Sequence, residues 1–126
     1  MKLIEVTTDA GAVLEIPDHQ ISFVAKQPLE REFMLVLTSA AMRVNGALTP
    51  FDKIKNDLIE SDTDFIKFPI PEGTEALVNP NNVLFITAIE LNITTLMFAG
   101  NLNLVVNEGI NTVRIKLQNS IFDCGE

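Results

Sequence analysis

Few side chains in this chain of 126 residues could carry out acid–base chemistry. His19 is the only histidine, and it follows Asp18 in a turn after Pro17. A histidine beside a carboxylate is one component of a general-base site. Adjacent residues rarely face one another, however, and no nucleophile accompanies the pair. We interpret both as polar turn residues, and the sequence predicts no catalytic residue and no enzyme activity.

Metal and cofactor sites are not expected either. Glu60, Asp62 and Asp64 lie close together, and their oxygens could hold a hard cation such as Ca²⁺. No glycine-bearing loop or distal glutamate follows at EF-hand spacing, so the run is interpreted as a solvated hinge. Cys124 is the single cysteine, which excludes a disulfide within the chain and a cysteine-based metal site. No phosphate-binding glycine motif occurs.

The charge pattern bears on the class of partner. The net charge is −8, shared evenly between the two halves, and no basic stripe is present. Release of counterions from phosphates requires clustered lysine and arginine. The sequence therefore predicts that nucleic acid is not the main partner, and it disfavours anionic membranes. No signal peptide and no run of about 20 apolar residues is found, so we expect a cytoplasmic protein, or one assembled into a virion.

The two halves of the chain share a pattern. The segment KLIEV (2–6) aligns with DFIKF (64–68), and VLEIPDHQISFV (13–24) aligns with EALVNPNNVLFI (75–86). Apolar and polar residues alternate in these segments, as in half-buried β-strands. The pattern indicates a tandem duplication, and the alternative is two β-meanders that merely look alike.

Each half ends in a segment with helical spacing. In 50–60, Phe51, Ile54 and Leu58 form one apolar stripe, which we expect to lie on a sheet. Thr49 is predicted to cap this helix. The segment 108–119 fits a helix or a strand, and the parallel with the first half favours a helix.

The predicted fold class is α+β, mainly antiparallel β. Two similar ββββ(β)α units, 1–62 and 63–126, form one compact duplicated domain. The units are expected to meet through the sheet of the second unit, unless that sheet forms an interface between subunits.

Apolar strand surface in the second half is the basis of the expected interaction. The strand 83–89 is apolar at all but one position, and such a strand is usually covered on both faces. A unit of this size cannot cover all of its apolar strands, so another half or another subunit must do so. The candidate interface residues are Leu84, Ile86, Met97, Phe98, Leu102, Leu104 and Val106.

The segment 77–113 resembles FlbD-type small flagellar proteins through Asn79, Pro80 and the spacing of its apolar residues. Its strand rhythm is also similar to that of LytTR-type DNA-binding domains. The second resemblance implies a regulatory module that binds DNA or RNA.

Three functions follow from these observations. The favoured one is a non-enzymatic assembly or adaptor protein, homo-oligomeric and acting on protein partners, of phage or mobile-element origin. A regulatory nucleic-acid-binding module is the first alternative. A small-molecule sensor with a pocket between the halves is the second.

Overall fold

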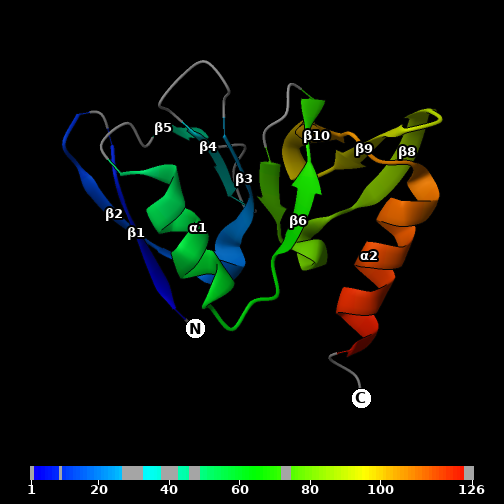
Figure 1. The fold of residues 1–126 in the computed structure, drawn as a ribbon. Helices are drawn as coiled ribbons and strands as arrows, with labels where there is room; N and C mark the ends of the chain where they lie inside the picture. Colours follow the sequence, from blue (N-terminus) through cyan, green and yellow to red (C-terminus); the bar gives the residue numbers. More distant parts are fainter. Residues whose placement is uncertain are drawn as a thin grey trace.

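The computed structural model describes residues 2–8, 10–26, 33–37, 43–45, 49–71 and 75–123. Figure 1 shows the first half of the chain on the left and the second half on the right. The first half consists of β1 (Leu3–Thr7), β2 (Val13–Pro17), the 3₁₀ turn η1 (Asp18–Gln20), β3 (Ile21–Lys26), β4 (Phe33–Leu37), β5 (Arg43–Asn45) and α1 (Phe51–Ile59). The second consists of β6 (Ile66–Pro69), β7 (Glu75–Val78), η3 (Pro80–Asn82), β8 (Phe85–Glu90), β9 (Ile93–Met97), η4 (Ala99–Asn101), β10 (Asn103–Val106) and α2 (Ile110–Asp123).

Three antiparallel sheets make up the β-structure. β1 pairs with β2, and β8, β9 and β10 form a three-stranded sheet in the order β10-β9-β8. The middle sheet has the order β5-β4-β3-β7-β6, so it joins three strands of the first half to two of the second. The expected α+β class, mainly antiparallel, is therefore confirmed.

The middle sheet separates two hydrophobic cores, and β3 contributes to both. Successive side chains of a strand point to opposite faces of its sheet. Ile21 and Val24 lie in the first core, whereas Phe23 and Ala25 lie in the second. All four are at most 2% exposed, so β3 is the strand that is covered on both faces.

The first core lies under α1 and the β1–β2 hairpin. Ile4 and Val6 are buried, whereas Leu3 and Glu5 on the other face of β1 are exposed. The stripe expected on the first helix, made of Phe51, Ile54 and Leu58, packs into this core. The prediction that this helix lies on a sheet is confirmed.

The cap predicted for that helix is wrong. Pro50 occupies the N-cap position and no side chain caps the helix. The hydroxyl of Thr49 instead accepts a hydrogen bond of 2.7 Å from the backbone N–H of Thr7. Thr49 therefore ties the start of α1 to the end of β1, a long-range contact that sequence spacing cannot reveal.

The second core lies between the middle sheet, the three-stranded sheet and α2. Val113 and Leu117 of α2 are buried there, which agrees with the helix expected over 108–119. Phe23 from the first half meets Phe98 from the second, with their ring centroids 4.9 Å apart. The second core therefore contains side chains from both halves.

The strand predicted over 83–89 differs from expectation. We predicted cover on both faces, but β8 is an edge strand and most of its side chains are exposed. Phe85 and Ile89 are 58% and 57% exposed. An apolar run indicates a strand with both faces covered only when a core lies on each face of its sheet, as it does at β3.

Candidate functional site

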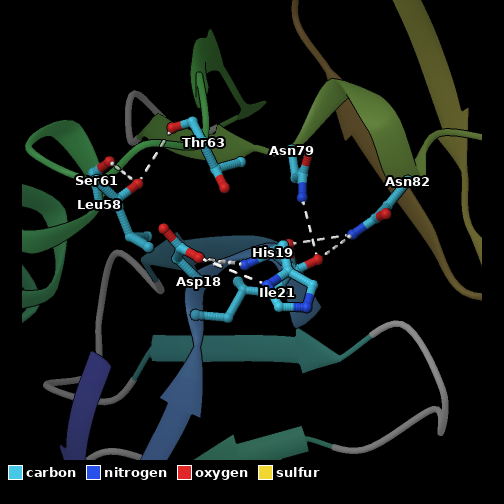
Figure 2. Close-up of polar contacts among 8 residues, drawn as sticks. All are labelled: Asp18, His19, Ile21, Leu58, Ser61, Thr63, Asn79 and Asn82. Atoms are coloured by element: carbon cyan, nitrogen blue, oxygen red, sulfur yellow. Dashed lines mark hydrogen bonds and ion pairs between the residues drawn. The ribbon is translucent and has the colours of Figure 1, made fainter. Parts of the chain in front are cut away.

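A polar joint connects the turn η1 to the turn η3 (Figure 2). Asn79 is 1% exposed, its side-chain oxygen accepts from the Asn81 N–H at 3.1 Å, and its amide donates to the His19 carbonyl at 3.4 Å. Asn82 donates to the carbonyls of His19 and Ile21 at 3.4 and 3.3 Å. These amides satisfy backbone carbonyls of the first half, so the joint fixes how the two halves meet.

Asp18 holds the turn η1 from inside the protein. Its side chain is 2% exposed, and Oδ1 accepts the His19 N–H at 2.8 Å. Nδ1 of the half-exposed His19 ring lies 3.7 Å from the same oxygen. Within the described residues Oδ2 has no hydrogen-bond partner. The predicted polar-turn role fits this arrangement, and the contacts of the pair include no nucleophile.

The acidic run lies beyond the end of α1. Glu60, Asp62 and Asp64 are exposed there, and among the described residues no group of three metal-binding side chains comes together. The Ser61 hydroxyl closes the turn by contacting the carbonyls of Leu58 and Thr63 at 2.8 and 3.1 Å. Figure 2 shows this turn beside the polar joint. Cys124 lies outside the described residues.

Most lysines of the described chain lie beside carboxylates. Lys2 is near Asp57 and Glu60, at 3.9 and 3.8 Å, and Lys53 pairs with Asp57 at 3.2 Å. Lys55 on α1 pairs with Glu75 on β7, and Lys116 on α2 pairs with Glu108 just before that helix. These cations are largely neutralised locally, so the surface around α1 offers little net positive charge to an anionic partner.

The exposed face of α2 has a different character. Residues 110–122 contain Arg114 and Lys116 but no aspartate or glutamate. The exposed positions on this helix include the apolar Ile115. The other exposed side chains carry amides, a hydroxyl and one guanidinium: Asn111, Thr112, Arg114, Gln118 and Asn119. The Arg114 guanidinium donates to the Asn111 side chain at 2.8 Å, which holds it near the start of the helix. We call these five residues the α2 polar face.

An open pocket of about 520 Å³ lies beside the start of α2. It is lined by residues 88–92 of the β8–β9 hairpin and by residues 109–112. Gly109 allows the close approach, because a Cβ there would lie 2.8 Å from the Leu91 carbonyl oxygen. The first N–H groups of a helix have no partner within the helix and favour anions. The pocket thus lies at the start of α2, where Asn111 is part of its lining.

The structure separates the seven candidate interface residues into three groups. Phe98, Leu104 and Val106 are buried in the second core. Ile86, Met97 and Leu102 are half-buried, and Ile86 and Leu102 pack against that core. Leu84 alone is well exposed, at 63%.

Sequence reasoning missed the α2 polar face. Its signal was the absence of acidic residues from 110–122 in a chain with a net charge of −8. We considered only the charge of whole halves, and that average conceals the acid-free segment 110–122.

In the part of the chain that the structure describes, no helix is long and apolar enough to cross a membrane. No protein-family model matches the sequence. No curated protein matches it either.

A search of solved structures does find a match. It is the LytTr DNA-binding domain of a protein described as a methyl-accepting/DNA response regulator from Bacillus cereus. The TM-score is 0.66 at 11% sequence identity, over 94% of this chain and 97% of that domain. This agrees with the LytTR-type resemblance seen in the strand rhythm. The FlbD-type resemblance and a phage origin find no support.

The match corrects one prediction. Net charge and the lack of a basic stripe led us to predict that nucleic acid is not the main partner, and the likeness to a DNA-binding domain contradicts this. Net charge describes solubility and long-range steering, whereas a fold is set by the pattern of apolar residues. Over nearly its whole length, the chain is therefore similar in fold to a LytTr DNA-binding domain.

Proposed function

We propose that this protein is a regulatory DNA-binding module. The observation that carries the proposal is the likeness in fold to a LytTr DNA-binding domain, which extends over 94% of the chain. The likeness thus extends over nearly the whole chain and is not limited to one hairpin. The proposal takes up the nucleic-acid alternative and replaces the phage adaptor that the sequence favoured.

The charges suggest how such a module would meet DNA. A net charge of −8 repels a polyanion at long range, so steering by the whole protein does not drive binding. The contact must be local, at a surface that acidic side chains leave free. The α2 polar face meets this requirement beyond the first turn of the helix, because 110–122 contain no acidic residue and Glu108 is paired with Lys116 at 2.7 Å. The exposed Glu90 of the β8–β9 hairpin lies beside the first turn.

The side chains of the α2 polar face suit phosphates and base edges. Asparagine, glutamine, threonine and arginine all contact DNA phosphates, and amides and arginine also read bases. The start of a helix also favours phosphates, because its first N–H groups have no partner within the helix. We therefore propose that α2 contacts the duplex, with Arg114 as its main charged contact.

Fluorescence anisotropy with a pool of labelled random-sequence DNA duplexes tests this proposal. Because few cationic side chains would contact phosphates, we expect weak binding. The slope of log K against log salt concentration should be shallow, roughly −1 to −2. Arg114→Ala should reduce the size of that slope by about one. Lys53→Ala is the matched control, because Lys53 lies on α1 and is paired with Asp57.

Two results would overturn this assignment. One is no binding by the wild type at low salt and high protein concentration. The other is equal loss of binding in Arg114→Ala and Lys53→Ala, which would mean that only overall charge matters.

We also propose that the protein is not an enzyme. The pair formed by Asp18 and His19 serves the turn η1, where Oδ1 of the Asp18 carboxylate accepts the backbone N–H of His19. We therefore assign the pair a structural role in the turn and no role in catalysis.

A further inference from the structure

The elements of the two halves follow the same order. Each half begins with a hairpin, β1–β2 or β6–β7, continues through a 3₁₀ turn and three strands, and ends in a helix. With the sequence alignment of 13–24 to 75–86, β3 corresponds to β8 and β2 corresponds to β7. β3 and β7 pair with each other, whereas their equivalents β8 and β2 each lack such a neighbour among the described residues.

The first half uses β3 to hold the hairpin of the second half. β3 pairs antiparallel with β7, with Phe23 opposite Val78, Val24 opposite Leu77 and Ala25 opposite Ala76. The Asn79 N–H extends the pairing to the Ser22 carbonyl at 2.9 Å. The strands β5, β4 and β3 of the first half thus form one sheet with the β6–β7 hairpin of the second half.

The second half has the same edge but no hairpin to place there. β8 pairs with β9 only, and among the described residues no strand lies along its other side. Leu84, Phe85 and Ile89 are 63%, 58% and 57% exposed, whereas the equivalent strand β3 is buried. β8 keeps the apolar composition of a central strand while occupying an edge.

The complementary edge lies at the other end of the molecule. β2 corresponds to β7, and it pairs with β1 only within the described residues. Its Val13 is 58% exposed. One molecule therefore carries both partners of the β3–β7 joint, at opposite ends and unused.

We propose that β8 of one copy pairs antiparallel with β2 of a second copy, which repeats the internal joint between molecules. In this register Phe85 lies opposite Ile16 of the second copy, Ile86 opposite Glu15 and Thr87 opposite Leu14. The contact is head-to-tail, so it builds open chains or rings, not closed pairs. It does not depend on DNA binding, which we place on α2.

Two residues of β2 keep this contact weak. Glu15 stands where the internal joint has the buried Leu77, and a charge on an edge strand discourages pairing. Pro17 corresponds to Asn79 and has no N–H, so the extra bond to Ser22 has no counterpart. Copies with a net charge of −8 also repel one another, and salt screens that repulsion. Assembly should therefore strengthen with salt, whereas DNA binding weakens.

Sedimentation of the full chain over a range of protein and salt concentrations tests the contact. Phe85→Lys blocks β8 and Val13→Lys blocks β2, and each is expected to hold the protein at the 13.9 kDa of one chain. In a mixture of the two variants, Val13→Lys supplies an unchanged β8 and Phe85→Lys supplies an unchanged β2. The mixture should form dimers and nothing larger.

Further variants sharpen the test. Ile115→Lys is the control, since Ile115 is 56% exposed but lies on α2. The assembly mass of this variant should equal that of the wild type at each concentration. Glu15→Leu restores the residue type of the internal joint and should tighten assembly about tenfold, an effect that Phe85→Lys should remove. Circular dichroism checks each fold, and Ile89→Lys replaces Phe85→Lys if that variant unfolds.

Three outcomes would overturn the proposal. The first is a wild type that stays monomeric at millimolar concentration in high salt. The second is assembly that Val13→Lys leaves intact, which would indicate pairing of β8 with itself. The third is a mixture of the blocked variants that remains monomeric.

Discussion

At the scale of single residues, side chains far apart in sequence decide how the elements meet. Thr49 accepts the N–H of Thr7 across 42 positions, and Asn79 reaches His19 across 60. Neither contact follows a local pattern of residue types. Local rules made Thr49 a helix cap, and a tertiary contact displaced that role.

Thr49→Val should destabilise the protein by about 1–2 kcal/mol, because it leaves the Thr7 N–H without its acceptor while keeping the side-chain shape. Thr8→Val is the control, because its hydroxyl accepts a longer bond of 3.2 Å from the Ala12 N–H in an exposed turn. Urea unfolding followed by circular dichroism measures both. Equal losses in the two variants would contradict the importance given to the Thr49 contact.

Gly109→Ala should cost about 1–3 kcal/mol, because the added Cβ would lie 2.8 Å from the backbone oxygen of Leu91. The hairpin or the start of α2 must then move, which also distorts the pocket. Thr112→Ala, an exposed change in the same helical turn, should be close to neutral. Urea unfolding and amide chemical shifts of residues 88–92 provide the measurement, and unchanged shifts would argue against the close contact.

At the scale of elements, amphipathic segments were predictable and their neighbours were not. The alternation in β1 and the stripe of α1 gave their buried faces correctly, because each pattern depends on the geometry of one element. The apolar run of β8 misled us, because the same run suits a central strand such as β3. Which strand receives a second neighbour depends on the path of the whole chain.

The stripe of α1 offers a matched pair for a stability test. Ile54 is fully buried and Ile59 is 51% exposed on the same helix. Ile54→Ala should therefore cost about 2–5 kcal/mol, from lost burial and the cavity left behind. Ile59→Ala should change the free energy of unfolding by no more than about 0.5 kcal/mol. Chemical denaturation of both variants measures the two losses of stability. Comparable losses would contradict the burial of the Ile54 face of α1.

At the scale of the whole molecule, the middle sheet links the two cores into one unit. The sequence indicated two similar halves, but it could not show that β3 and β7 pair or that Phe23 contacts Phe98. The candidate site was equally hidden, because the α2 polar face depends on which side of α2 faces the core. Charge averaged over the chain even argued against the class of partner that we propose.

Linked cores should unfold together. We expect Ile54→Ala in the first core and Val113→Ala in the second each to shift one cooperative transition of the entire protein. The chain has no tryptophan or tyrosine, so circular dichroism and amide hydrogen exchange are the suitable probes. Protection lost in only one half, or two separate transitions, would show that the cores are independent.

The pairing of β3 with β7 also affects how the protein emerges from the ribosome. Phe23 cannot pair until Val78 has been synthesised, 55 residues later. At roughly 5–20 residues per second, that interval lasts about 3–11 seconds. Throughout it the nascent β3 has an uncovered apolar side, which makes it a natural ligand for chaperones near the exit tunnel. Slower translation of the segment between these strands should lengthen that exposure and lower the yield of folded protein.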